Sequence, residues 1–139
     1  MKAIKLNNGF FIRLDRNEMI ISSLKNFLDT QNIKTASIQG IGAVQKIEIG
    51  RYEVANKKFI TKKFYGEFEV VSLIGNITLS PDDNINIHLH IAFADKDYHL
   101  FGGHLVEATV SATFEIFVTP YNQTVKRKFD NDTGLNLIE

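Results

Sequence analysis

All four histidines of the sequence fall within residues 88–104, and three of them, His88, His90 and His104, are spaced so that they could act together. Along residues 84–94, apolar residues alternate with polar or small ones, a period of two that is typical of a half-buried strand. His88 and His90 therefore share one face. Turn-forming residues at 95–97 reverse the chain, which predicts that His104 returns opposite His90 within about one position of register. Cross-strand Cβ atoms lie about 4.5 to 5.5 Å apart, so three imidazoles can converge on one point.

Three imidazole nitrogens at about 2.0 to 2.1 Å from an ion form a zinc site whose fourth position is open to water or a ligand. Imidazole suits several divalent transition metals, and the sequence contains no cysteine to compete as a ligand. We therefore predict a site for zinc, or for another divalent transition metal, on His88, His90 and His104. The alternative is that these histidines are polar residues of a solvated sheet face. His99, inside the connecting loop, is expected to be a surface residue.

Other residues that could serve this chemistry are less specific. Glu67 and Glu69 alternate onto one strand face, where either could be a fourth ligand, an acceptor that orients a histidine, a general base or an ordinary rim carboxylate. Residues 40–43, rich in glycine, join two predicted strands without a following helix, so they predict close backbone packing or a tight turn rather than a phosphate site. Ser72 has no base adjacent in the sequence, and no catalytic residue is assigned.

Length and composition predict one soluble domain over residues 1–139. The 16 basic and 16 acidic residues give a formal net charge of zero, unlike the basic composition of most nucleic-acid-binding domains. The first residues lack the apolar run of a signal peptide, and no stretch is apolar for long enough to span a membrane. Because cysteine is also absent, we expect a cytoplasmic protein.

One amphipathic helix is predicted to cover a sheet. The spacing of Asp15 and Glu18 suggests a capping box at its start, and Asn32 offers a stop. Between them, the apolar stripe consists of Ile20, Ile21, Leu24, Phe27 and Leu28. Strands are predicted at 10–14, 35–39, 44–53, 58–65, 68–79, 85–94 and 106–118, with turns at 54–57 and 80–83. These elements predict an α+β fold with a mainly antiparallel sheet and one principal helix.

Two of these strands are strongly apolar. The even positions of residues 106–118 form a continuous apolar face that we expect in the core. Residues 68–79 carry large apolar side chains on both faces, which need cover on both sides. One face holds Phe68, Val70 and Ile74, and the other holds Val71, Leu73, Ile77 and Leu79. The C-terminal tail around Leu135, Leu137 and Ile138 is also apolar, so it is expected to pack on the body or on a neighbouring subunit, and a symmetric oligomer is favoured.

Several segments, in order, resemble the PPC domain that is shared by plants and prokaryotes, over nearly the whole chain. They are Ser37–Val44, Gly66–Ile77, His88–His90 with Gly102–Leu105, and Phe129–Leu135. The three histidines make the chain similar to the stand-alone prokaryotic type. The resemblance implies an α/β fold built around an antiparallel sheet, assembled as a homotrimer. It also implies an association with DNA, because in plants the domain follows an AT-hook that enters the minor groove.

The residues themselves give little support to DNA binding. The sequence has no Arg-Gly-Arg-Pro hook, and its basic clusters at 57–58, 62–63 and 126–128 predict solvated faces or turns. Three hypotheses remain: a trimeric metal-binding domain with a binding or regulatory role toward a small anionic or carbonyl ligand; a zinc-dependent enzyme with Glu67 or Glu69 as proton acceptor; and a DNA-binding architectural protein. We favour the first.

Overall fold

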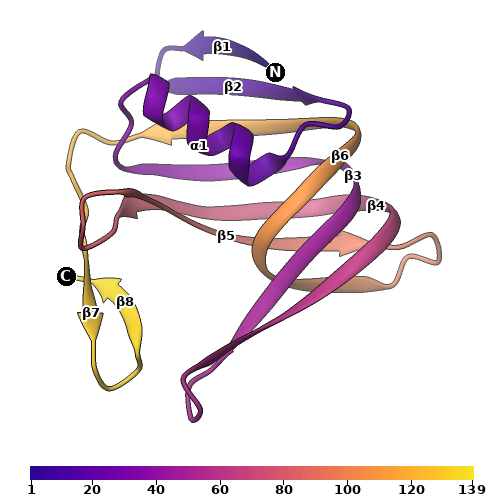
Figure 1. The fold of residues 1–139 in the computed structure, drawn as a ribbon. Helices are drawn as coiled ribbons and strands as arrows, with labels where there is room; N and C mark the ends of the chain where they lie inside the picture. The colour runs from indigo at the N-terminus through magenta and orange to yellow at the C-terminus, as the bar shows by residue number, and fades with distance from the viewer.

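The computed structural model describes residues 1–139 and confirms the α+β fold, with a mainly antiparallel sheet and one helix (Figure 1). The elements are β1 (Lys2–Leu6), β2 (Gly9–Asp15), α1 (Ile20–Thr30), β3 (Ala36–Glu53), β4 (Lys58–Leu79), β5 (Ile85–Ala94), β6 (Leu100–Pro120), β7 (Arg127–Asp130) and β8 (Leu135–Ile138). The large sheet has the strand order β1-β2-β6-β3-β4-β5, and β5 pairs with β6 as well. This extra pairing closes β3, β4, β5 and β6 into a ring, while β7 and β8 form a separate hairpin.

Helix α1 covers the sheet through the predicted stripe. Ile20, Leu24, Phe27 and Leu28 are buried in the hydrophobic core, and Figure 1 shows the helix lying across the sheet. The helix ends at Thr30, and Asn32 adopts a left-handed conformation with a φ of 53°, as expected of a stop. No helix in the structure is long and apolar enough to cross a membrane.

The start of the helix differs from the prediction. Glu18 accepts a hydrogen bond from the backbone N–H of Asp15 at 2.6 Å, but this bond closes a turn before the helix and caps none of its N–H groups. Glu107 of β6 caps the helix instead. Its Oε1 accepts from the N–H of Ile21 at 2.8 Å, and its Oε2 accepts from the N–H of Ser22 at 3.1 Å. The carboxylate also lies at the positive end of the helix dipole.

Strands β3 and β4 each join two predicted strands into one, and a β-bulge changes the predicted faces of β4. The pairing of β4 with β5 shifts directly after Val70, which reverses the alternation of side chains. Phe68 and Val70 therefore share the core face with Leu73, whereas Val71 and Ile74 point outward with 53% and 55% of their surface exposed. The predicted division of this strand into two large apolar faces was wrong, because it assumed an unbroken period of two.

Strand β6 shows the same effect. Its predicted core face is buried at Ala108, Val110 and beyond, but Val106 is only half-buried and Ala112 is exposed. The register between β6 and β3 shifts once across each of these two residues, which have no partner on β3, so neither follows the alternation. Both predicted strands exist, but β6 begins at Leu100, six residues before the predicted start, and the assignment of faces fails at the bulges.

Close backbone packing, rather than a turn, explains the glycines at 40–43. The segment lies inside β3, where Gly42 has a φ of 153° and the pairing shifts between Gly40 and Gly42. A Cβ on Gly42 would lie 2.5 Å from the carbonyl oxygen of Thr113 on β6. The strands can approach this closely only because no side chain stands between them.

The C-terminal tail contacts the body of the same chain, as the first of the two predicted alternatives stated, but Leu137 and Ile138 remain exposed. Tyr52 of β3 donates its hydroxyl hydrogen to the carbonyl oxygen of Thr133 at 2.9 Å, and Leu135 is half-buried. Lys57 donates to the carbonyl oxygen of Asn131 at 2.6 Å. The hairpin of β7 and β8 is therefore held against the β3–β4 end of the sheet by polar contacts; neither β1 nor this hairpin was predicted.

Candidate metal centre

The hairpin of β5 and β6 brings the three predicted histidines together. His90 lies directly opposite His104 in the register, as predicted, and His88 precedes it on the same face of β5. The ring centroids are 5.2 Å apart for His88 and His90, 5.2 Å for His88 and His104, and 5.7 Å for His90 and His104. One ring nitrogen of each residue lies within 4.8 Å of the others. The ligands of a tetrahedral zinc ion are about 3.3 Å apart, so small side-chain rotations would suffice to bind one.

Glycines allow three strands to meet at His104. This residue lies between His90 of β5 and Gly50 of β3. A Cβ on Gly50 would collide with the ring of Phe59, and a Cβ on Gly103 would lie 3.0 Å from the carbonyl oxygen of Gly50. The space that Gly50 leaves is filled by Phe59, whose ring meets that of His104 edge to face at 5.5 Å. The imidazole of His104 is therefore held against an aromatic wall.

Two of the three imidazoles are half-buried, and this keeps them neutral. Burial, followed by the neighbouring rings of His88 and His90, lowers the pKa of His104 to about 4. Burial also lowers the pKa of His88, with smaller effects from the Arg127 guanidinium and His90. At neutral pH both residues carry a free lone pair, which is the form that coordinates a metal ion.

The histidines line a cavity of about 690 Å³ that is closed on one side by the C-terminal hairpin. Strands β3, β4, β5 and β6 and the hairpin all contribute to its wall. Besides the histidines, the lining side chains include Arg51, Tyr52, Phe59, Asn86, Ile87, Arg127, Leu135, Asn136 and Leu137. None of the lining residues is an aspartate or a glutamate.

Arg127 of β7 is the residue of this site that the sequence interpretation missed. Its guanidinium donates to Thr78 Oγ1 at 2.8 Å, to Asn76 Oδ1 at 3.1 Å and to the carbonyl oxygen of Asn136 at 2.9 Å. Nη2 also lies 3.4 Å from Nδ1 of His88. Arg127 thereby joins the hairpin to the strands that carry the histidines.

The sequence predicts a solvated face or a turn for the basic cluster at 126–128, and for Arg127 this was wrong, because it is a half-buried residue of β7. Lys126 and Lys128 are exposed, whereas Arg127 between them is half-buried. The alternation of burial across three basic residues reflects the period of two of a strand. A strand signal in this short segment was the information that could have located Arg127 in the site.

Glu67 and Glu69 do not belong to the site. Both are exposed, and Glu69 pairs with Ala94, whereas the β4 partner of His88 is Asn76. The stretch of β5 from residue 88 to residue 94 spans about 20 Å at 3.3 Å per residue. Neither carboxylate can reach an ion on the histidines, so the fourth-ligand and general-base interpretations were wrong. The rim-carboxylate alternative agrees with their exposure.

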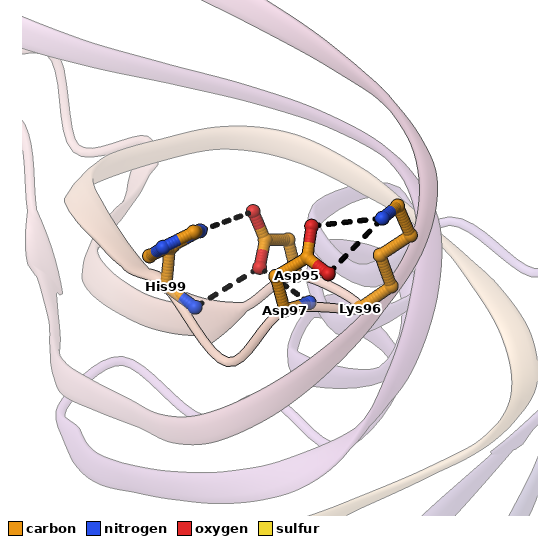
Figure 2. Close-up of polar contacts among 4 residues, drawn as sticks. All are labelled: Asp95, Lys96, Asp97 and His99. Carbon is orange, nitrogen blue, oxygen red and sulfur yellow. Dashed lines mark hydrogen bonds and ion pairs between the residues drawn. The ribbon is translucent and has the colours of Figure 1, made fainter.

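Asp95, Asp97 and His99, in the turn between β5 and β6, form a second group of potential ligands (Figure 2). Oδ1 of Asp95 accepts from the N–H groups of Asp97 and His99, each at 2.9 Å, and Oδ2 lies 3.4 Å from Nδ1 of His99. Lys96 donates to the Asp97 carboxylate at 2.8 Å. These contacts define the turn and satisfy its carboxylates. The side chain of His99 is 72% exposed, which confirms its predicted surface position.

A ring of antiparallel strands under one helix, with three clustered histidines on its β5–β6 hairpin, defines the class of protein. The chain belongs to the Plants and Prokaryotes Conserved (PCC) domain family, whose sequence profile matches residues 1–122. This is the PPC domain that the sequence resembles, so that identification is confirmed. No curated protein matches the chain.

Solved structures of similar proteins extend over almost the whole chain. A protein from Bacteroides thetaiotaomicron, provisionally named as DNA-binding, is 28% identical with a TM-score of 0.95, covering 99% of this chain and 96% of that one. A metal-containing protein from Archaeoglobus fulgidus is 32% identical with a TM-score of 0.87, covering 97% and 95%. A plant- and prokaryote-conserved (PPC) protein from Pyrococcus horikoshii is also 32% identical, with a TM-score of 0.87, covering 97% and 93%.

Proposed function

We propose that this protein is a metal-binding member of the family, in which His88, His90 and His104 hold one divalent transition ion, preferably zinc. The pairing of His90 with His104, with His88 on the same face, carries this proposal because it gathers three imidazoles at one point. The metal-containing relative from Archaeoglobus fulgidus supports it. Three protein ligands leave a coordination position for a small molecule, so we assign the protein a binding or regulatory role. We place it in the cytoplasm, as expected from the sequence.

Metal analysis of the purified protein tests this proposal. We expect about one zinc ion per chain, because each chain provides a complete set of three imidazoles. His90→Ala should abolish binding, whereas His99→Ala, a matched change in the same hairpin, should leave it intact. Equal metal content in the two variants would contradict the assignment.

A zinc-dependent enzyme acting on a small molecule is the weaker alternative. Hydrolysis at zinc needs a proton acceptor close to the activated water. Glu67 and Glu69 are too distant, and no aspartate or glutamate lines the cavity. The lining residues therefore support binding of a ligand better than hydrolysis.

We also propose that the chain assembles as a homotrimer. Ile41, Val71, Ile74 and Phe117 are each at least 50% exposed, and together with Phe11 they line one hollow of about 360 Å³ on the sheet. An exposed apolar patch of this kind is typical of a subunit interface. Light scattering should give the mass of a trimer, and Ile74→Lys should reduce it. A monomeric wild-type protein at micromolar concentration would refute the proposal.

DNA binding is the second candidate, supported by the provisional name of the Bacteroides thetaiotaomicron relative. Several charges in the basic clusters are balanced by acids: Lys63 lies 3.6 Å from Glu48, and Lys126 pairs with Asp83. We therefore expect duplex DNA to bind no more tightly than about 10⁻⁵ M at physiological salt, within the non-specific range. Nanomolar, salt-sensitive binding to A·T-rich duplex in a gel shift would reverse this ranking.

A further inference from the structure

The cavity beside the histidines is positively charged before any ion is added. Arg127 and Arg51 are its charged lining residues, and no acidic residue lines it. Arg51 is 67% exposed and bonded to Glu53 at 2.7 Å, so its charge is balanced outside the cavity. Arg127 is half-buried, and all of its hydrogen-bond partners are neutral. A divalent ion would add two further positive charges, so the occupied cavity needs an anion to balance them.

Metal binding would also change what Arg127 can donate to. Its Nη2 faces Nδ1 of His88 at 3.4 Å. If His88 coordinates through Nδ1, that nitrogen has no lone pair left for Arg127; if it coordinates through Nε2, Nδ1 carries the proton and repels the guanidinium. In both cases an N–H of Nη2 loses its partner. Nη1 has two N–H groups, and only one of them binds Asn136. One N–H of Nη1 and one N–H of Nη2 are therefore free to donate, and arginine can hold a carboxylate with such a pair.

The rest of the cavity fits an organic anion better than an inorganic one. Phe59 and Leu137, both on the cavity wall, keep 43% and 42% of their surface exposed, and Leu135 adds to the same wall. The volume of about 690 Å³ is typical of a small-molecule site. Apolar side chains on one part of the wall and donors on another match a ligand with one charged end.

We propose that the cavity binds a small carboxylate with a short apolar chain, its carboxylate held by Arg127 beside the metal ion and its chain packed against Phe59 and Leu137. This inference rests on the proposed metal site. It names the chemical class of the ligand at that site and assigns Arg127 as the residue that distinguishes a charged ligand from a neutral one.

Calorimetry on cobalt(II)-loaded protein tests this inference, with cobalt content measured first. Butyrate should bind at least 10-fold more tightly than butyramide, its neutral isostere, and should perturb the visible spectrum of the cobalt. Acetate should bind more weakly than butyrate, by up to roughly 4-fold for each methylene group removed. Inorganic phosphate should bind more weakly than butyrate.

The variants separate charge recognition from the stability of the hairpin. Arg127→Gln should lower the butyrate to butyramide affinity ratio at least several-fold while cobalt content is unchanged, and the preference that remains is due to the cobalt charge. Lys57→Ala, which removes the bond from the ammonium group to the carbonyl oxygen of Asn131 and lies outside the cavity wall, should leave that ratio at its wild-type value. Leu137→Ala should reduce the gain in affinity that each methylene group gives between acetate and butyrate. The ratio is informative because a loosened hairpin would lower the affinities for butyrate and butyramide together and leave their ratio unchanged.

Three results would overturn the inference. If wild-type protein binds cobalt but prefers butyrate no more than butyramide, the carboxylate site is wrong and the metal site stands. If phosphate binds more tightly than butyrate, the ligand class is wrong. If no cobalt binds, the proposed function itself fails.

Discussion

Replacing Glu107 by alanine should strongly destabilise the protein, because this one carboxylate anchors the helix to β6. It accepts hydrogen bonds from the backbone N–H groups of Ile21 at 2.8 Å, Ser22 at 3.1 Å and Ala108 at 2.9 Å, and from the Ser22 hydroxyl at 2.8 Å. Loss of an N-cap costs about 0.5 to 2 kcal/mol, and a hydrogen bond to a charged group is worth about 1.5 to 3 kcal/mol. Because water replaces part of these contacts, we expect the free energy of unfolding to fall by about 3 kcal/mol.

Urea denaturation followed by circular dichroism measures this change. Glu67→Ala, at an exposed position of β4 where the carboxylate makes no hydrogen bond or ion pair, is the matched control and should alter stability by less than about 0.5 kcal/mol. Glu107→Gln keeps an acceptor oxygen but loses the charge at the helix terminus, so it should cost about 1 to 2 kcal/mol. If Glu107→Ala changed stability no more than the control does, capping of the helix from β6 would be refuted.

Three further changes test the site and its surroundings. In metal-free protein, the free energy of unfolding should fall as the pH drops from about 6.5 toward 4, since unfolded His104 takes up a proton in this range and folded His104, with its pKa lowered to about 4, does not. Urea midpoints across this range should show a flatter slope for His104→Gln; an unchanged slope would argue against the burial of this ring. Gly75→Ala should abolish soluble folded protein, or cost more than about 3 kcal/mol, because its Cβ would collide with the carbonyl oxygen of His88; a native-like circular dichroism spectrum would contradict this. Tyr52→Phe should speed hydrogen exchange selectively in β7 and β8. If the exchange rates of these two strands were the same in the variant as in the wild type, the hydroxyl would not be an anchor of the hairpin.

The half of the cavity that holds the three histidines could be predicted because its geometry is local. Alternation along β5 sets the common face of His88 and His90, and a single turn sets the position of His104. The other half could not be predicted in this way. Arg127 reaches the site through Thr78 and Asn76 of β4, contacts between segments far apart in the sequence that leave no local pattern.

The errors in the predicted fold have a related cause. Alternation predicts a strand well until a bulge interrupts it, and the positions of the bulges near Val70 and Val106 depend on pairing with other strands. The helix cap is similar, because Asp15 and Glu18 have the spacing of a capping box while Glu107 provides the cap from a distant strand. In each case a long-range contact outweighed a local preference.

All three histidines lie in one hairpin, whereas the sheet is completed by strands from opposite ends of the chain, with Phe10 of β2 paired with Val118 of β6. Hairpins form within about 1 to 10 μs, and pairings between distant segments are the slow steps of folding. The three histidines can therefore come together while β2 is still unpaired and before the C-terminal wall has docked. If they bind a metal ion as proposed, the ion can enter at that stage, when the site is open to solvent, and the folded protein would not have to open to admit it.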